Sequence, residues 1–169
     1  GGLLQERTIA VAGCRPAFNL RGTIMTVDAE GGCLCGAVRY RITQDPQVQC
    51  YCCCETCQGA SGAPAVAWIA VPETGFSVTQ GEPVSYHSSA QGIREFCGQC
   101  GTALTYRNEG YADQRFQADS LVAITMVSLD DKEAFTPSEL FHDDELPTWL
   151  TAENLCPGAL RHHPADPSW

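Results

Sequence analysis

The chain carries many cysteines, and their spacing is typical of metal ligands. Eleven cysteines occur in 169 residues, and because the count is odd they cannot all be paired in internal disulfides. The first group is Cys33-Leu34-Cys35, and side-chain alternation in extended backbone would place both sulfurs on one side. The second is Cys97-Gly98-Gln99-Cys100-Gly101, whose glycines permit a turn that aims backbone N–H groups at the thiolates.

Together these two pairs supply four thiolates. This donor set suits a tetrahedral zinc ion with Zn–S distances of about 2.3 Å and no position left for substrate. We therefore expect Cys33, Cys35, Cys97 and Cys100 to converge on one structural zinc. The clip would close a loop of 61 residues and contribute to folding, because closing such a loop is entropically costly. The alternative is two disulfides or plain buried thiols.

A third group extends from Cys50 to Cys57 and contains the triplet Cys52, Cys54 and Cys57. Three thiolates with one open position are typical of a reactive zinc, and a substrate thiol bound there loses its proton. We predict that these three cysteines are the site of chemistry. Cys50 lies on the same side of an extended chain, so a second hypothesis is that Cys50, or Cys53, closes the site as a fourth ligand.

The segments that must position these groups have mainly β-type composition, broken by Gly and Pro. The expected strands are Ala37–Thr43, Ala65–Val71, Phe76–Thr79, Val84–His87, Thr102–Tyr106 and Leu121–Leu129. Alternation is clearest in the first strand, where Val38, Tyr40 and Ile42 share one face and Arg39 and Arg41 share the other. We therefore expect a mainly β fold.

Helical periodicity is weak throughout the chain. The two candidates are Tyr111–Ser120 and Pro147–Asn154, and both are short. We expect low helix content, with an N-terminal arm at residues 1–30, one zinc-binding domain at residues 31–156 and an irregular tail at residues 157–169.

The amino-acid composition limits the classes of partner that the chain is expected to bind. Twenty acidic against ten basic side chains give a formal charge of −10, which argues against nucleic acid as a partner. No run approaches the roughly 20 apolar residues of a membrane-spanning helix. The chain begins Gly1-Gly2 and shows no secretory signal, so we expect a reducing, cytoplasmic setting.

Three sequence blocks resemble the glutathione-dependent formaldehyde-activating enzyme family, which includes the centromere protein V-like domains. The blocks are Gly31-Gly32-Cys33-Leu34-Cys35-Gly36-Ala37-Val38-Arg39-Tyr40, Cys52-Cys53-Cys54-Glu55-Thr56-Cys57 with Ser61-Gly62-Ala63, and Arg94-Glu95-Phe96-Cys97-Gly98-Gln99-Cys100-Gly101-Thr102. The resemblance covers about residues 31–150. It implies twisted antiparallel sheets of the β-tent type pinned by a four-cysteine zinc site.

The resemblance also implies a second zinc on Cys52, Cys54 and Cys57, and a carbon–sulfur lyase activity that joins glutathione and formaldehyde to give S-(hydroxymethyl)glutathione. This chain departs from the family at Cys53, where a histidine is usual, and at Gln58-Gly59, where basic residues commonly follow. Cations that could meet an anionic ligand are Arg39, Arg41, Arg94 and Arg107.

Two other readings compete with this enzyme. One is a non-catalytic, zinc-stabilised binding module in which both metal sites are closed. The other is a methionine sulfoxide reductase of similar sheet architecture, which would need a nucleophilic cysteine outside the zinc ligands, Cys14 or Cys156.

Overall fold

A computed structural model of the protein describes residues 27–108 and 120–162. Within them the strands form two sheets and the helices are short, which confirms the expectation of a mainly β fold. No helix in these ranges has the length and apolar character needed to cross a bilayer. Residues 1–26 of the expected arm, residues 111–119 of the expected helix Tyr111–Ser120 and residues 163–169 of the expected tail lie outside the described residues.

The smaller sheet has three antiparallel strands in the order β1-β2-β5. The strands are β1 (Ala29–Gly32), β2 (Arg39–Ile42) and β5 (Phe76–Gln80). Ala29 pairs with Ile42, so the described end of the expected arm is part of this sheet. The alternation predicted for β2 is present, because Tyr40 and Ile42 are buried and Arg41 is exposed.

The larger sheet has eight strands in the order β11-β10-β3-β4-β9-β8-β7-β6. In this order the strands are Leu160–His162, Glu139–Phe141, Val48–Cys52, Val66–Pro72, Leu121–Thr125, Ala103–Asn108, Gly92–Phe96 and Val84–His87. Strand β10 pairs in parallel with both β3 and β11, and the other pairs are antiparallel. Residues 160–162 of the expected irregular tail thus form an edge strand.

The helices are α1 (Glu55–Ser61) and α2 (Ala152–Leu155), with 3-10 turns at Glu73–Gly75, Met126–Ser128 and Asp143–Glu145. Only α2 lies near a predicted helix, and it is shorter and later than Pro147–Asn154 because Thr151 caps it with its side chain. Strand β9 ends at Thr125, so the strand expected to reach Leu129 continues instead as a 3-10 turn.

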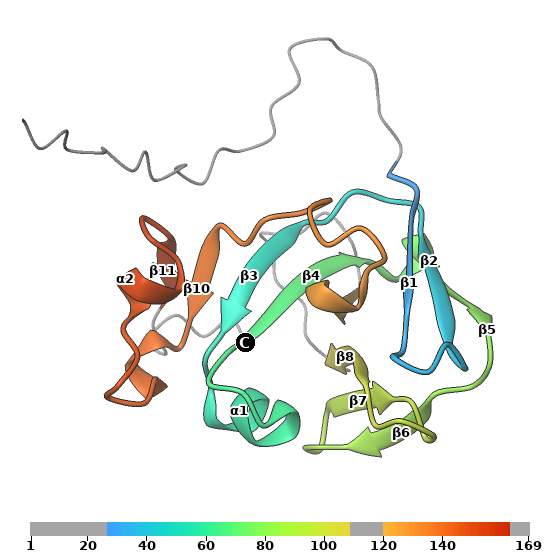
Figure 1. Cartoon of the computed structure of the whole chain (residues 1–169), viewed down its shortest axis with the longest axis horizontal. Coiled ribbons are helices and arrows are strands. Elements are labelled where there is room, and N and C mark those ends of the chain that lie inside the picture. Colours follow the sequence, from blue (N-terminus) through green and yellow to red (C-terminus); the bar gives the residue numbers. More distant parts are fainter. Residues whose placement is uncertain (1–26, 109–119, 163–169) are drawn as a thin grey trace, which may run out of the picture.

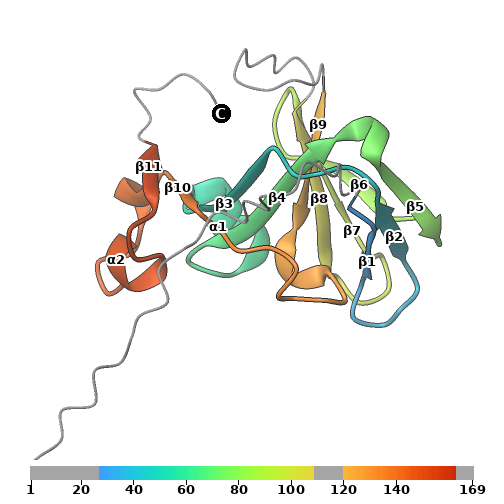
Figure 2. The same cartoon turned by 90° about the horizontal axis from the view of Figure 1, so that it is seen from above.

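The three-stranded sheet lies beside the β6–β9 end of the larger sheet, and α2 lies with β10 and β11 at the opposite end (Figures 1 and 2). The first core joins β2 of the small sheet to β4, β8 and β9 of the large one. The second core covers the other face of the large sheet and includes Cys57 of α1. Strand β4 contributes to both, with Ile69 in the first and Trp68 in the second. This two-sided burial holds in place the strands whose ends and connections carry the cysteines.

Candidate functional site

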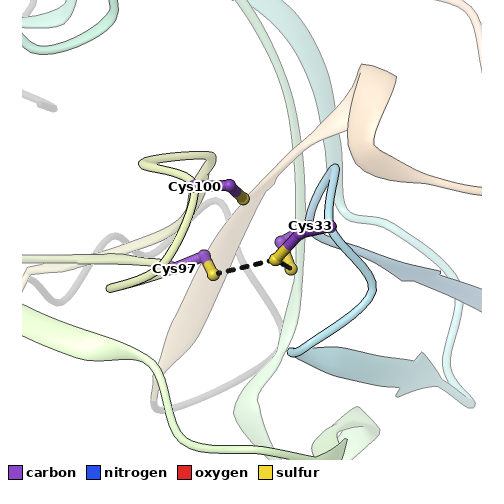
Figure 3. Close-up of side chains that lie close together, drawn as sticks. Cys33, Cys97 and Cys100 are labelled. Carbon is purple, nitrogen blue, oxygen red and sulfur yellow. Dashed lines mark hydrogen bonds between the residues drawn. The ribbon is translucent and has the colours of Figure 1, made fainter.

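The four cysteines of the two pairs converge where the two sheets meet. Cys33 and Cys35 lie in the connection between β1 and β2, and Cys97 and Cys100 lie in the connection between β7 and β8. Their four Sγ atoms all lie within 4.8 Å of one another. Figure 3 shows Cys33 facing Cys97 and Cys100 across the gap between these two connections. The convergence expected from the sequence is therefore present.

Each pair sits in a tight turn that a left-handed glycine completes. The Gly36 N–H donates to the Cys33 carbonyl oxygen at 3.0 Å, and the Gly101 N–H donates to that of Cys97 at 2.8 Å. Both glycines have positive φ, 76° and 74°, which other residues adopt only with strain. The Cys33–Cys35 pair is thus in a turn and not in the extended backbone from which its geometry was predicted.

Backbone donors approach the sulfurs, as the glycine-containing turns predicted. The Val38 N–H donates to Cys33 Sγ at 3.2 Å, and the Gln99 N–H donates to Cys97 Sγ at 3.4 Å. Hydrogen bonds with the hydroxyl and backbone of Thr102 lower the pKa of Cys100 to about 5. The turns therefore favour the thiolate at Cys100, and a thiolate is the form that binds a metal.

The sulfur geometry fits a tetrathiolate metal site and excludes disulfides. Four sulfurs placed about 2.3 Å from a central ion would lie about 3.8 Å apart. The Cys33–Cys35 and Cys35–Cys97 sulfurs are 3.5 and 3.7 Å apart, whereas a disulfide would bring two sulfurs to about 2.05 Å. None of the ten cysteines in the described ranges forms a disulfide. This all-sulfur donor set suits a four-coordinate metal ion.

The triplet forms a second group of converging sulfurs. Cys52 ends β3, Cys54 is the N-cap of α1, and Cys57 lies in the first turn of that helix. Their Sγ atoms lie within 4.8 Å of one another, and those of Cys52 and Cys54 are 3.4 Å apart. The Cys57 N–H donates to Cys54 Sγ, so the same cysteine also caps the helix.

Cys50 and Cys53 do not join this group. Cys50 is buried in the second core, on the same face as Cys52 but one strand repeat earlier, which separates the two by about 6.8 Å along the strand. Cys53 is fully buried in a third cluster, with Leu140 of β10. In the part of the chain that the structure describes, the metal-ligand group therefore has three cysteines and no fourth.

An arginine faces the triplet and favours a thiolate there. Hydrogen bonds from the thiols of Cys52 and Cys54, together with the nearby Arg94 guanidinium, lower the pKa of Cys57 to about 2. The pKa of Cys52 rises because its thiol donates to the other two sulfurs. Arg94 Nη2 lies 3.6 Å from Cys57 Sγ, and its guanidinium lies over the ring of Tyr106, 4.8 Å from the centroid. The arrangement therefore favours the thiolate form of Cys57 beside the Arg94 cation.

The other arginines considered from the sequence are engaged elsewhere. Arg39 pairs with Asp130, Arg41 pairs with Asp28, and Arg107 pairs with Glu73 and Glu95. Of the four, Arg94 is the one that meets a cysteine cluster. Isolated Cys156 is buried, and its thiol donates to the Pro137 carbonyl oxygen, whereas Cys14 lies outside the described residues.

Helix α1, which sequence reasoning missed, is docked by residues far along the chain. Glu145 Oε2 accepts from the Glu55 N–H at 2.6 Å, and Gln58 Nε2 donates to the carbonyl oxygens of Cys53 and Glu145. Gln58, one of the two positions at which this chain was expected to depart from the family it resembles, thus performs a structural task. The signal available in the sequence was Gly62, a glycine at the C-cap position after the last turn; Cys54, the N-cap, is not a residue type usually preferred there.

Comparisons with known proteins agree with the arrangement of the cysteines. The family described as glutathione-dependent formaldehyde-activating enzyme matches residues 28–144. A Schizosaccharomyces pombe protein named as an uncharacterized lyase is 38% identical over 85 residues, a match that covers 46% of this chain and 56% of the yeast protein. The chain thus spans little more than half the length of that relative.

A crystal structure of a Rhodobacter sphaeroides protein is also similar, with a TM-score of 0.46 and 20% sequence identity, over 64% of this chain and 91% of that one. A likeness at this level supports no inference about function. The family match covers more than half of the chain and includes all seven cysteines of the two converging groups. The chain therefore belongs to the glutathione-dependent formaldehyde-activating enzyme family.

Proposed function

We propose that this protein is a zinc-dependent carbon–sulfur lyase-like enzyme that adds a thiol, glutathione or a similar one, to formaldehyde or another small electrophile. The observation that carries the proposal is the three-sulfur group of Cys52, Cys54 and Cys57, to which the described residues add no fourth cysteine. A site with three protein ligands leaves room for a substrate, whereas a four-cysteine site does not.

In this proposal the two cysteine groups have different tasks. Cys33, Cys35, Cys97 and Cys100 hold a structural zinc that ties the two sheets together. Cys52, Cys54 and Cys57 hold a second zinc, which would supply a Lewis acid that keeps a bound substrate thiol deprotonated. Seven protein sulfurs on two ions are consistent with both groups as the structure places them.

The chemistry that the triplet would support is the addition of a thiolate to a carbonyl carbon. A carbon–sulfur bond forms, the carbonyl π electrons pass to oxygen, and that oxygen takes up a proton, which gives an S-hydroxymethyl product when the electrophile is formaldehyde. The chain contributes by holding the reactants close together, which converts a bimolecular encounter into a local one. The cysteines of the described residues form no disulfides, which supports a reducing compartment, for which we propose the cytoplasm.

Two matched alanine variants test the proposed site. Cys52→Ala should lower the zinc content from two ions to one and abolish acceleration of adduct formation. Cys50→Ala, two residues earlier on the same strand face, should retain both ions and the activity. Zinc is measured by elemental analysis, and S-(hydroxymethyl)glutathione formation is followed by NMR exchange against the uncatalysed rate.

The same experiment separates the enzyme from the closed binding module. If Cys50→Ala loses the second zinc, the site has four protein sulfurs and no position for substrate. If the wild-type protein carries two zinc ions but accelerates adduct formation with no thiol in a panel that includes glutathione, the proposed activity is wrong although the metal sites are right.

A further inference from the structure

Arg94 occupies a specific place beside the triplet. It lies on β7 opposite Tyr106 of β8, and its guanidinium lies over the Tyr106 ring, which holds it in position. From there Nη2 reaches Cys57 Sγ at 3.6 Å. No carboxylate of the described residues forms an ion pair with it, so its charge is directed at the cysteine group.

The Arg94 guanidinium is buried at one atom, although the residue as a whole is partly exposed. Arg94 Nε is inaccessible to solvent and has no hydrogen-bond partner among residues 27–108 and 120–162, and a buried donor left in this state costs free energy. A partly exposed arginine could turn toward solvent and satisfy this donor with water. The arrangement instead retains a costly donor in order to hold a positive charge against Cys57.

The Arg94 cation would balance the charge of a metal-bound triplet. Three thiolates and one divalent ion leave one excess negative charge, and that charge lies against the second core, where Cys57 is buried. Uncompensated charge in such surroundings is strongly unfavourable. The Arg94 guanidinium supplies the missing positive charge at hydrogen-bond distance from one of the three sulfurs.

We propose that Arg94 is a positioning residue that sets the metal affinity of the triplet, by neutralising its excess charge and orienting Cys57. This inference rests on the proposed function, because it assumes that Cys52, Cys54 and Cys57 bind a divalent ion. It concerns affinity at one site only. The four-cysteine group has its own backbone donors, and Arg94 makes no contact with it among the described residues.

The test measures metal affinity in three variants of the intact chain, with Cys52→Ala as a reference. Arg94→Met removes the charge at similar side-chain length, and Arg94→Lys retains the charge without the planar fork. Arg107→Met is the matched control: Arg107 lies on the neighbouring strand and pairs with Glu73 and Glu95. Metal-depleted protein is titrated with cobalt against a competing chelator, and the thiolate absorption reports binding. Comparison of the wild type with Cys52→Ala identifies which of the two classes of site is the triplet.

We expect Arg94→Met to lower the metal affinity of the triplet about ten- to a hundredfold, the range found when a group that supports a metal ligand is removed. Arg94→Lys should recover most of the loss, and the four-cysteine class should not change in any variant. Arg107→Met should resemble the wild type at both classes.

Three results would overturn the proposal: unchanged affinity in Arg94→Met, equal losses in the Met and Lys variants, or equal weakening of both classes, which would indicate a general effect on folding. If the wild-type protein lacks a second class of site, the proposed function fails together with this inference. If the wild type has both classes and Arg94→Met does not differ from it, only the inference about Arg94 fails.

Discussion

Replacement of Cys35 and Cys100 by serine would remove one sulfur from each turn of the four-cysteine group. The two residues are suitable because Cys35 is exposed and Cys100 is only partly buried, so neither serine opens a large cavity in the core. The two remaining sulfurs cannot complete a tetrahedral site. The double variant should therefore release the connection between the two sheets.

The size of the effect follows from the length of the loop. Cys35 and Cys97 are 62 positions apart, and closing a loop of that length restricts the unfolded chain by about 4 kcal/mol in the chain-entropy treatment of cross-links. For a domain of this size we expect the midpoint of thermal unfolding to fall by about 10 °C. Cys52→Ala opens only the short loop from Cys52 to Cys57, for which the same treatment gives about 2 kcal/mol.

Urea unfolding at pH 7, followed by circular dichroism with and without a zinc chelator, measures both effects. Chelation should destabilise the wild type by at least as much as the double substitution does, and should affect the double variant much less. The reasoning is refuted if the double variant unfolds within about 1 kcal/mol of the wild type, or if the chelator destabilises the two proteins equally. Either result would mean that the four sulfurs do not share an ion.

Three further predictions concern the surroundings of the sites. Glu145→Ala should lower the free energy of unfolding by about 1 kcal/mol, because the first backbone N–H of α1 loses its acceptor; Glu145→Gln, which retains an acceptor, should cost less in the same urea titration. The hydrogen bond from Arg39 lowers the pKa of Asp130, so the pair stabilises the fold above the ordinary carboxyl pKa and is lost as the pH falls through the lowered value. Asp130→Asn should therefore destabilise at pH 7, by less than about 1 kcal/mol in this exposed pair, and the loss should shrink as the pH falls below the ordinary carboxyl pKa; a loss that does not change with pH would contradict this. Gly31→Ala should cost about 2 kcal/mol because its Cβ would collide with a buried tyrosine side chain and a backbone carbonyl, whereas Gly59→Ala, which faces open space on α1, should not destabilise.

Local pattern was sufficient where a feature depends on residues close in sequence. The alternation around Tyr40 and Ile42 predicted β2 and its buried face, and both side chains are buried in the first core. The spacing of Cys97 and Cys100 predicted a glycine-closed turn, and the turn is closed by Gly101. Each of these features needs only a few adjacent residues, whose backbone preferences are not overruled by distant contacts.

Features that depend on distant partners escaped prediction. Helix α1 has only seven residues, too few for a helical period to be recognised, and the Glu145 side chain that docks its first turn lies 90 positions away. Strands β10 and β11 have three residues each and pair in parallel across long separations. Isolated segments this short are not stable, so their own residues carry little information about their state.

The sequence by itself determined which donor atoms are available, which cysteines are spaced as pairs and triplet, and which family the chain resembles. Only the tertiary structure decided that Cys50 remains within the strand while the chain turns at Cys53, so that Cys54 and Cys57 return toward Cys52. It also decided that Arg94, among the four arginines considered from the sequence, faces the triplet. The physical reason is that spacing sets the reach of neighbouring side chains, whereas the sheet register and the docking of α1 set which side chains from distant segments meet.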